Sequence, residues 1–469
     1  MRRKRNLQNE FDFQPSNLKV TNDYFGRYAA IDEILRATPE VLDPVHRDLK
    51  KAIASERKRQ RAYDYTSETV LRMVIVQQIE SLSQRALVIR IDDSCFLRRF
   101  VGIHNGKMMD FSTYNRLKNG IRPATWKAIN DALSVAAVEA GAVSGEALRC
   151  DTTAVETNIH YPTDSSLLWD VYRVLARLVR AAREIDSESV GDRRLQDKTA
   201  KRHATWISRK ASKKRGLSAA MKEHYEALFG LVEGLVVWAD EVAAALRRAL
   251  ARDVFAFDAA LVAQSIVADL DHHLPLGRTV LDQAQRRVLF GETVPSADKL
   301  YSIFEPHTEL LVRGKAGKPV EFGHMVHLQQ VENKYITDYG VFLRRPKEPA
   351  LVDPALARHR ELFGTDPDTL SADKGYYESM EKIDRLGKSI DVVAIGKKGR
   401  RSEAEIEREH SDAFRAGQRF RAGIEGSISF LKRALRLARC FNKGWNHFVA
   451  TVGATVFAHN LLVLARGSG

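Results

Sequence analysis

The sequence is poor in the residues that build disulfide frameworks and zinc sites. Only three cysteines occur, Cys95, Cys150 and Cys440, and no two of them form a Cys-x-x-Cys pair. A structural zinc site is therefore not expected, and the low count is typical of a protein from a reducing cytosol. Cys150 is expected to be a small buried strand residue and not a nucleophile.

Long apolar runs are also scarce. No apolar stretch follows Met1-Arg-Arg-Lys-Arg5, so a secretory signal is not expected. The most apolar stretch runs from Phe448 to Leu464 and contains Thr451, His459 and Asn460, which predicts a core helix and not a membrane span. We therefore expect a cytoplasmic protein without a membrane partner.

Negative charge is in deficit. The chain has 74 Lys and Arg against 60 Asp and Glu, a net charge of +14 and a pI of about 9.6. Such a surplus suggests a polyanionic partner, with nucleic acid as the first candidate and association with the nucleoid as the consequence. The alternative is a basic soluble protein with no such role. At 44% hydrophobic residues and 469 residues, the chain can form two or three globular domains.

The hydrophobic periodicity divides the chain into regions. Residues 1–25 predict a flexible basic arm, and residues 26–140 a helical domain with basic faces, including the run Ser55-Glu-Arg-Lys-Arg-Gln-Arg61. Residues 141–465 predict an α/β domain, interrupted at about 165–290 by an all-helical insertion. Strands are expected at 146–155, 300–304, 310–312, 319–328, 336–343, 370–373 and 389–395, which together predict a mixed sheet with flanking helices.

Three acids stand where such a fold could bring them together. Asp151 lies in a predicted strand, and Asp373 ends another strand, which breaks at Gly375. Glu425 lies on a predicted helix, four residues after Arg421 and seven before Lys432, so all three charges share one helical face. Carboxylate oxygens are the ligands that Mg²⁺ and Mn²⁺ prefer. Two such ions could act on a phosphodiester.

At these residues the sequence resembles the bacterial insertion-sequence DDE transposases, of the ISNCY group and its IS4- and IS5-like relatives. Three segments carry the resemblance: Asp151-Thr-Thr-Ala-Val-Glu-Thr-Asn-Ile-His-Tyr-Pro-Thr-Asp-Ser, Ser371-Ala-Asp-Lys-Gly-Tyr-Tyr and Arg421-x-x-x-Glu425-x-x-x-x-x-x-Lys432. The last is the most specific, because it fixes three residue types at set spacings. Relatives often have Tyr three residues before the Arg, where this chain has Gln418.

The resemblance implies an RNase H-like catalytic core in which Asp151, Asp373 and Glu425 hold two Mg²⁺ ions, with Mn²⁺ as a substitute. It implies that Arg421 and Lys432 contact DNA, and that the helical N-terminal domain recognises element ends and mediates dimerisation. The partners would be double-stranded DNA, as terminal inverted repeats and target, and a second copy of the chain.

Two further basic segments are candidate DNA contacts. Basic residues around a Trp can hold phosphates and stack a base, and basic residues after a buried strand can contact the backbone. The alternative for both is a solvated charged surface. The candidates are Trp206, Arg209, Lys210, Lys213, Lys214 and Arg215 in the insertion, and Lys397, Lys398, Arg400 and Arg401 after the last strand.

Together these observations predict a transposase that cleaves its element ends and joins them to target DNA. Two alternatives stay open. One is a metal-dependent nuclease of the same fold, which cuts without joining. The other is a domesticated DNA-binding protein that has lost the chemistry.

Overall fold

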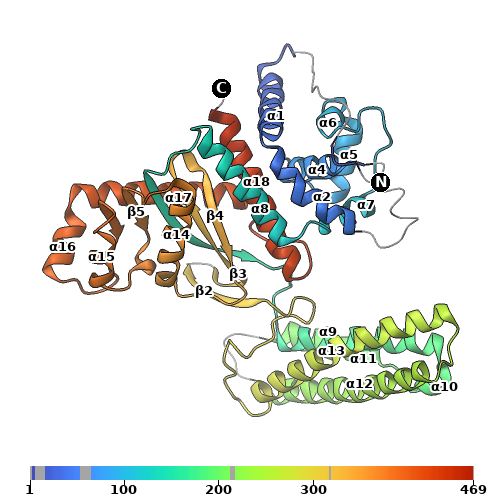
Figure 1. The fold of residues 1–469 in the computed structure, drawn as a ribbon. Helices are drawn as coiled ribbons and strands as arrows, with labels where there is room; N and C mark the ends of the chain where they lie inside the picture. Colours follow the sequence, from blue (N-terminus) through green and yellow to red (C-terminus); the bar gives the residue numbers. More distant parts are fainter. Residues whose placement is uncertain (1–2, 6–15, 53–64, 212–216, 316–317, 468–469) are drawn as a thin grey trace. The chain divides into compact units, whose positions relative to one another are not determined.

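The chain forms two compact units. The computed structural model describes residues 3–5, 16–52, 65–211, 217–315 and 318–467 (Figure 1). One unit combines Met1–Thr157 with Gly323–Gly469, and the other is Asn158–Phe322. The second unit therefore interrupts the first in the sequence. The predicted run 55–61 and residues 1–2 and 6–15 of the predicted arm lie outside the described residues. The prediction of a flexible arm is wrong for residues 19–25, because helix α1 already begins at Lys19.

The first unit begins with helices and ends with a long buried one. Its N-terminal helices are α1 (Lys19–Ala37), α2 (Leu42–Lys51), α4 (Ser67–Ile79), α5 (Gln84–Asp93), α6 (Cys95–Phe100), α7 (Phe111–Asn119) and α8 (Pro123–Glu139). The C-terminal helix α18 (Trp445–Gly467) packs against α1, α4 and α8. It is long and apolar enough to span a membrane, but 67% of its apolar window is buried inside the protein. In the structure α18 is a core helix.

A six-stranded mixed sheet follows the N-terminal helices, and only β2 and the first residues of β3 come from the range Asn158–Phe322. The strands are β1 (Ala147–Glu156), β2 (Glu309–Lys315), β3 (Lys318–Gln330), β4 (Ile336–Val341), β5 (Thr369–Ala372) and β6 (Val392–Ile395). The order is β2-β3-β1-β5-β6, with β4 also on β3. β1 is antiparallel to β3 and parallel to β5, and β6 is parallel to β5. The expected mixed α/β fold is confirmed.

Helices lie on both faces of this sheet. Because successive strand residues point to opposite faces, Arg149 and Asp151 face one side and Leu148 and Cys150 the other. The Arg149 side is covered by α17 (Asp412–Arg433). On the other side, Leu148 and Cys150 share a core with α14 (Val352–Phe363) and α15 (Met380–Leu386). The short helix α16 (Glu403–His410) precedes α17.

The second unit is mainly a helical bundle. It contains α9 (Asp164–Ile185), α10 (Ser187–Val190), α11 (Asp197–Lys210), α12 (Ala219–Ala251) and α13 (Phe257–Val288). Its apolar core draws only on residues between Leu167 and Phe304. The range from 165 to 290, predicted as helix, is therefore helical in the described residues apart from short connections.

One predicted strand is wrong. Residues 300–304 form no strand, because side chains take the backbone groups that a sheet would need. The Gln283 amide donates to the Leu300 carbonyl at 3.0 Å and accepts from the Leu300 N–H at 2.9 Å. The Ser302 hydroxyl accepts the N–H groups of Phe304 and Glu305. The apolar residues that suggested a strand are instead buried against the helical bundle.

A candidate active site on two parallel strands

Asp151 and Asp373 lie side by side on neighbouring strands. In the parallel pair β1–β5, Cys150 is opposite Ala372. An aspartate directly follows each of these two residues, and adjacent strands are about 4.8 Å apart. The Asp373 carboxylate accepts the Gly375 N–H at 2.7 Å, which fixes the turn where β5 ends. Residues 222 positions apart in the sequence are thus brought to one edge of the sheet.

Helix α17 approaches this edge closely because Gly417 has no side chain. A Cβ at Gly417 would lie 2.5 Å from the Ala394 Cβ and 3.2 Å from the Ser371 hydroxyl. The next residue, Gln418, donates its amide to the Ala372 carbonyl at 3.2 Å and to the Ala394 carbonyl at 2.5 Å. Gln418 therefore fastens α17 to the ends of β5 and β6.

Arg421, one turn after Gln418, lies between two of the predicted acids. Its guanidinium is 3.8 Å from an Asp151 oxygen and 3.1 Å from Glu425 Oε1. The Asp151 side chain is 14% exposed and that of Glu425 67%, so Glu425 lies at the mouth of the site. Ile424 and Leu431 of α17 are buried, so an apolar face anchors the helix.

The electrostatics of Asp151 are those of a crowded, desolvated carboxylate. Burial raises the pKa of Asp151 to about 6, against a hydrogen bond from the Thr152 N–H that lowers it. The negative charges of Asp373 and Glu348 raise the pKa further, while Arg421 lowers it. Like charges held together in this way favour any cation that can bind between them.

Glu348 is an acid of the site that the sequence did not suggest. It begins a short 3₁₀ turn, Glu348–Leu351, and its Oε1 accepts the Thr152 hydroxyl at 2.8 Å. A Cβ built on Gly375 would lie 2.0 Å from Glu348 Oε2 and 2.9 Å from Asp373 Oδ1, so both carboxylates border the space above this glycine. The only sequence signal was an acid between two prolines, Pro346 and Pro349, which ordinarily marks a turn.

Two buried polar groups lie beneath these acids. The Tyr376 hydroxyl has no hydrogen-bond partner among the described residues, and burial raises the pKa of Tyr376 well above its usual value. Burial lowers the pKa of His327 to about 4, so this side chain is neutral at pH 7. Its ring lies 6.0 Å from that of Tyr376. His324 instead contacts Trp445 and Phe448, so the two histidines face opposite sides of the sheet, as their spacing predicts.

The donor set suits Mg²⁺ by chemistry, although the carboxylates are not gathered into a closed cage. In the described part of the chain, no three Asp, Glu, His or Cys side chains are close enough to hold an ion. Arg421 takes the place between Asp151 and Glu425 that a cation would need. However, Mg²⁺ is commonly held by one or two carboxylates plus substrate phosphates. Asp151 and Asp373 supply two such carboxylates, and Glu348 adds a third over Gly375.

The basic residues after β6 lie at the same edge of the sheet, since β6 runs parallel to β5. Lys397 pairs with Glu405 at 2.9 Å and Arg401 with Glu409 at 2.9 Å, which fixes this segment against α16. Lys398 and Arg400 are exposed. The two exposed cations are therefore better placed than the two paired ones to contact a phosphate.

The other predicted DNA contacts have different surroundings. Lys432 is partly exposed near the end of α17. In the helical unit, Arg209 and Lys210 are exposed at the end of α11, and Trp206 stacks on His224 with centroids 3.9 Å apart. One face of the indole is thus already covered. Lys213, Lys214 and Arg215 lie outside the described residues.

Comparison with known proteins identifies the N-terminal region. Residues 25–120 match the family model described as "Transposase domain (DUF772)". This match covers the helices from most of α1 to α7 and supports a transposase family for the chain. The match ends before Asp151, so it does not include the three acids. No curated protein and no solved structure matched the chain.

Proposed function

We propose that the protein is a DDE-type DNA transposase that cleaves the ends of an insertion sequence and joins them to target DNA. The observation that carries this proposal is the parallel register of β1 and β5, which sets Asp151 beside Asp373, under a helix that presents Arg421 and Glu425. The match of residues 25–120 to a transposase domain supports it independently.

The strand arrangement supports an RNase H-like core. The central strand β1 has the antiparallel strands β3 and β4 on one side and the parallel strands β5 and β6 on the other. That arrangement, with one acid within β1 and another directly after β5, is the one expected of this fold. The second unit would then be an insertion between β1 and the rest of the sheet.

In this proposal the residues have distinct roles. Asp151 and Asp373 would hold Mg²⁺. Glu425 would become a third ligand once a DNA phosphate pairs with Arg421 in its place. Bound metal would activate a water or a DNA 3′-hydroxyl and stabilise the leaving oxygen. Arg421 would exchange its carboxylate partners for a phosphate, and Lys398, Arg400 and Lys432 would hold the DNA backbone nearby. Two element ends require pairing, so we propose a dimer as the active form.

The test is Mg²⁺-dependent cleavage and joining on DNA that carries the sequences flanking the gene. We expect Glu425→Gln to lower both rates on the order of a thousandfold, because a metal ligand is lost. DNA binding should persist. Glu407→Gln, an exposed acid on α16, is the matched control and should keep full activity.

The products separate the alternatives. Cleavage without joining would indicate a nuclease of the same fold. Salt-sensitive binding without chemistry, in Mg²⁺ or Mn²⁺, would indicate a domesticated binding protein. Full activity in Asp373→Ala would show that the assignment of the acids is wrong.

A further inference from the structure

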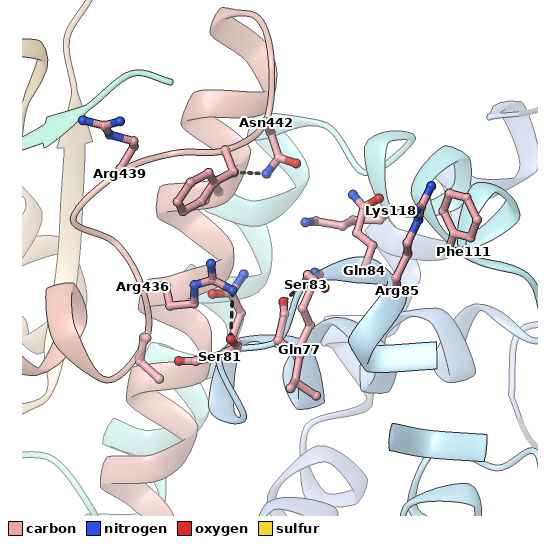
Figure 2. A pocket seen from close by; sticks show the side chains of 15 residues that line it. Gln77, Ser81, Ser83, Gln84, Arg85, Phe111, Lys118, Arg436, Arg439 and Asn442 are labelled. Atoms are coloured by element: carbon pink, nitrogen blue, oxygen red, sulfur yellow. Dashed lines mark hydrogen bonds between the residues drawn. The ribbon is translucent and has the colours of Figure 1, made fainter. Parts of the chain in front are cut away.

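A cavity lies in the first unit, apart from the acids. Its volume is about 440 Å³. Figure 2 shows side chains entering it from the N-terminal helices, among them Gln84, Arg85 and Lys118, and from the segment after α17, among them Arg436 and Asn442. A pocket of this size accepts a small ligand such as one nucleotide, whereas a double helix is too wide.

The charge of the pocket is wholly positive. Arg85, Lys118, Arg436 and Arg439 line it, and no Asp or Glu does. Arg439 is paired with Glu156 at 2.8 Å. Within the described residues, no carboxylate forms an ion pair with Arg85, Lys118 or Arg436. Burial also lowers the pKa of Lys118 to about 8. A bound anion would supply the missing counter-charge.

Two exposed aromatic rings complete the lining. Phe441 is 56% exposed and Phe111 is 40% exposed. The Arg436 guanidinium lies 5.1 Å from the Phe441 centroid, and that of Arg85 lies 4.6 Å from the Phe111 centroid. Each ring therefore has a guanidinium over one of its faces. Aromatic faces next to cations are what a nucleotide needs, because its base can stack while its phosphate is neutralised.

The backbone at the pocket is held in an unusual conformation. Ser81 and Arg436 have φ of +52° and +59°, which side-chain-bearing residues rarely adopt. They also contact each other: Arg436 donates to the Ser81 carbonyl at 3.0 Å, and the Ser81 hydroxyl donates to the Ala434 carbonyl. Backbone strain of this kind concentrates at ligand sites, where surrounding contacts maintain it.

The pocket wall is tied to the elements that carry the acids. Arg436 follows the last residue of α17, Arg433, by three positions. The backbone of Glu156, at the end of β1, donates to Ala438 at 3.0 Å and accepts from Cys440 at 2.8 Å. Asp151 lies five residues before Glu156, about 17 Å at the rise of a strand. A ligand in the pocket is therefore at a fixed distance from the candidate active site.

We propose that this pocket binds one unpaired nucleotide of a DNA end, with its phosphate on Arg85, Lys118 and Arg436 and its base on Phe441. The proposal rests on the proposed function, since it assigns the pocket to the DNA substrate of that reaction. It would hold a frayed or displaced strand at a set distance from Asp151.

The test is fluorescence anisotropy of the full chain with two duplexes in EDTA, where no cleavage occurs. One duplex is blunt, and the other ends in three unpaired nucleotides that include 2-aminopurine. The extension is placed on each of the two strands in turn. We expect the full chain to bind the extended duplex about tenfold more tightly and to quench 2-aminopurine. Arg85→Ala combined with Lys118→Met should bind both duplexes equally, and Phe441→Leu should lose the quenching.

Controls keep the outcomes distinct. Arg116→Ala, an exposed cation on α7 outside the pocket, should retain the preference, and circular dichroism melts should show that every variant folds. Equal binding of both duplexes by the wild type, or a preference that survives in the double variant, would overturn the proposal without touching the transposase assignment.

Two further outcomes address the source of the ligand and the function itself. Lys118-dependent binding of free dAMP, with no advantage for the extended duplex, would make the pocket a free-nucleotide site and overturn the DNA assignment. Failure to bind any DNA would overturn both proposals.

Discussion

At the scale of single residues, the candidate site holds like-charged carboxylates close together. Asp151 is desolvated and lies near Asp373 and Glu348, with Arg421 as the nearest cation. When folding raises the pKa of a carboxyl group, the folded protein becomes less stable as that group ionises. The fold is therefore less stable with three negative charges at this edge than it would be with neutral side chains there. A bound cation would restore the lost stability.

Asp151→Asn should therefore stabilise the metal-free protein at neutral pH. The folded pKa of about 6 exceeds the ordinary value of 3.8, so wild-type stability falls as the pH rises from about 4 to about 6. Above that range the variant should be more stable by up to about 3 kcal/mol, and below pH 4 the two should be equal. Calorimetry in EDTA checks this. A gain that is the same at pH 4 and pH 7.5 would contradict the electrostatic cause.

Glu348 should matter for metal use as well as for structure. Glu348→Gln keeps the shape but removes a charge that borders Gly375 and accepts from Thr152. We expect cleavage to fall about 10- to 100-fold, the usual effect of losing a partner of a metal ligand, with more Mg²⁺ needed for half-maximal rate. The Mg²⁺ titration is the measurement. Glu381→Gln, an exposed acid on α15, is the control. An unchanged Mg²⁺ requirement would show that Glu348 has a structural role only.

At the scale of elements, the site depends on how closely α17 approaches the sheet. Gly417→Ala should destabilise by about 1–3 kcal/mol, because the new Cβ would meet the Ala394 Cβ at 2.5 Å. Gly426→Ala on the same helix has nothing within 4 Å and should stabilise by about 0.5–1 kcal/mol, since alanine favours helix. Chemical denaturation measures both changes. Equal changes in the free energy of unfolding at the two positions would show that α17 does not need a glycine at 417 to pack against the sheet.

The same elements show what the sequence could predict. Strand and break patterns placed Asp151 and Asp373 in or at the end of strands, and helical spacing placed Arg421 and Glu425 on one face. The parallel pairing of β1 with β5, which makes the aspartates neighbours, is a long-range property that no local pattern contains. For the same reason Glu348 was missed, since Thr152, whose hydroxyl it accepts, lies 196 positions away in the sequence. The strand at 300–304 was predicted wrongly because an apolar pattern does not reveal that the Gln283 side chain hydrogen-bonds the backbone of Leu300.

At the scale of the whole molecule, the helical unit interrupts the sheet between Thr157 and Gly323. Its apolar core shares no residue with the cores of the first unit. Because each core is closed within its own unit, the two units should unfold as separate cooperative blocks. Calorimetry of the full chain should then resolve two transitions.

Cavity-forming substitutions should assign those transitions. Leu228 is fully buried in the helical unit and Leu148 is fully buried under the sheet. Replacing either with Ala removes buried methyl groups and should cost about 2–5 kcal/mol. Leu228→Ala should therefore lower one transition and Leu148→Ala the other, each leaving its counterpart within a degree or two. If either variant shifted both transitions together, the units would be energetically coupled, and the helical unit could not be regarded as an independently stable insertion. Separate shifts would mean that the helical unit can be inserted between β1 and the following strands without destabilising the part of the sheet that positions Asp151 and Asp373.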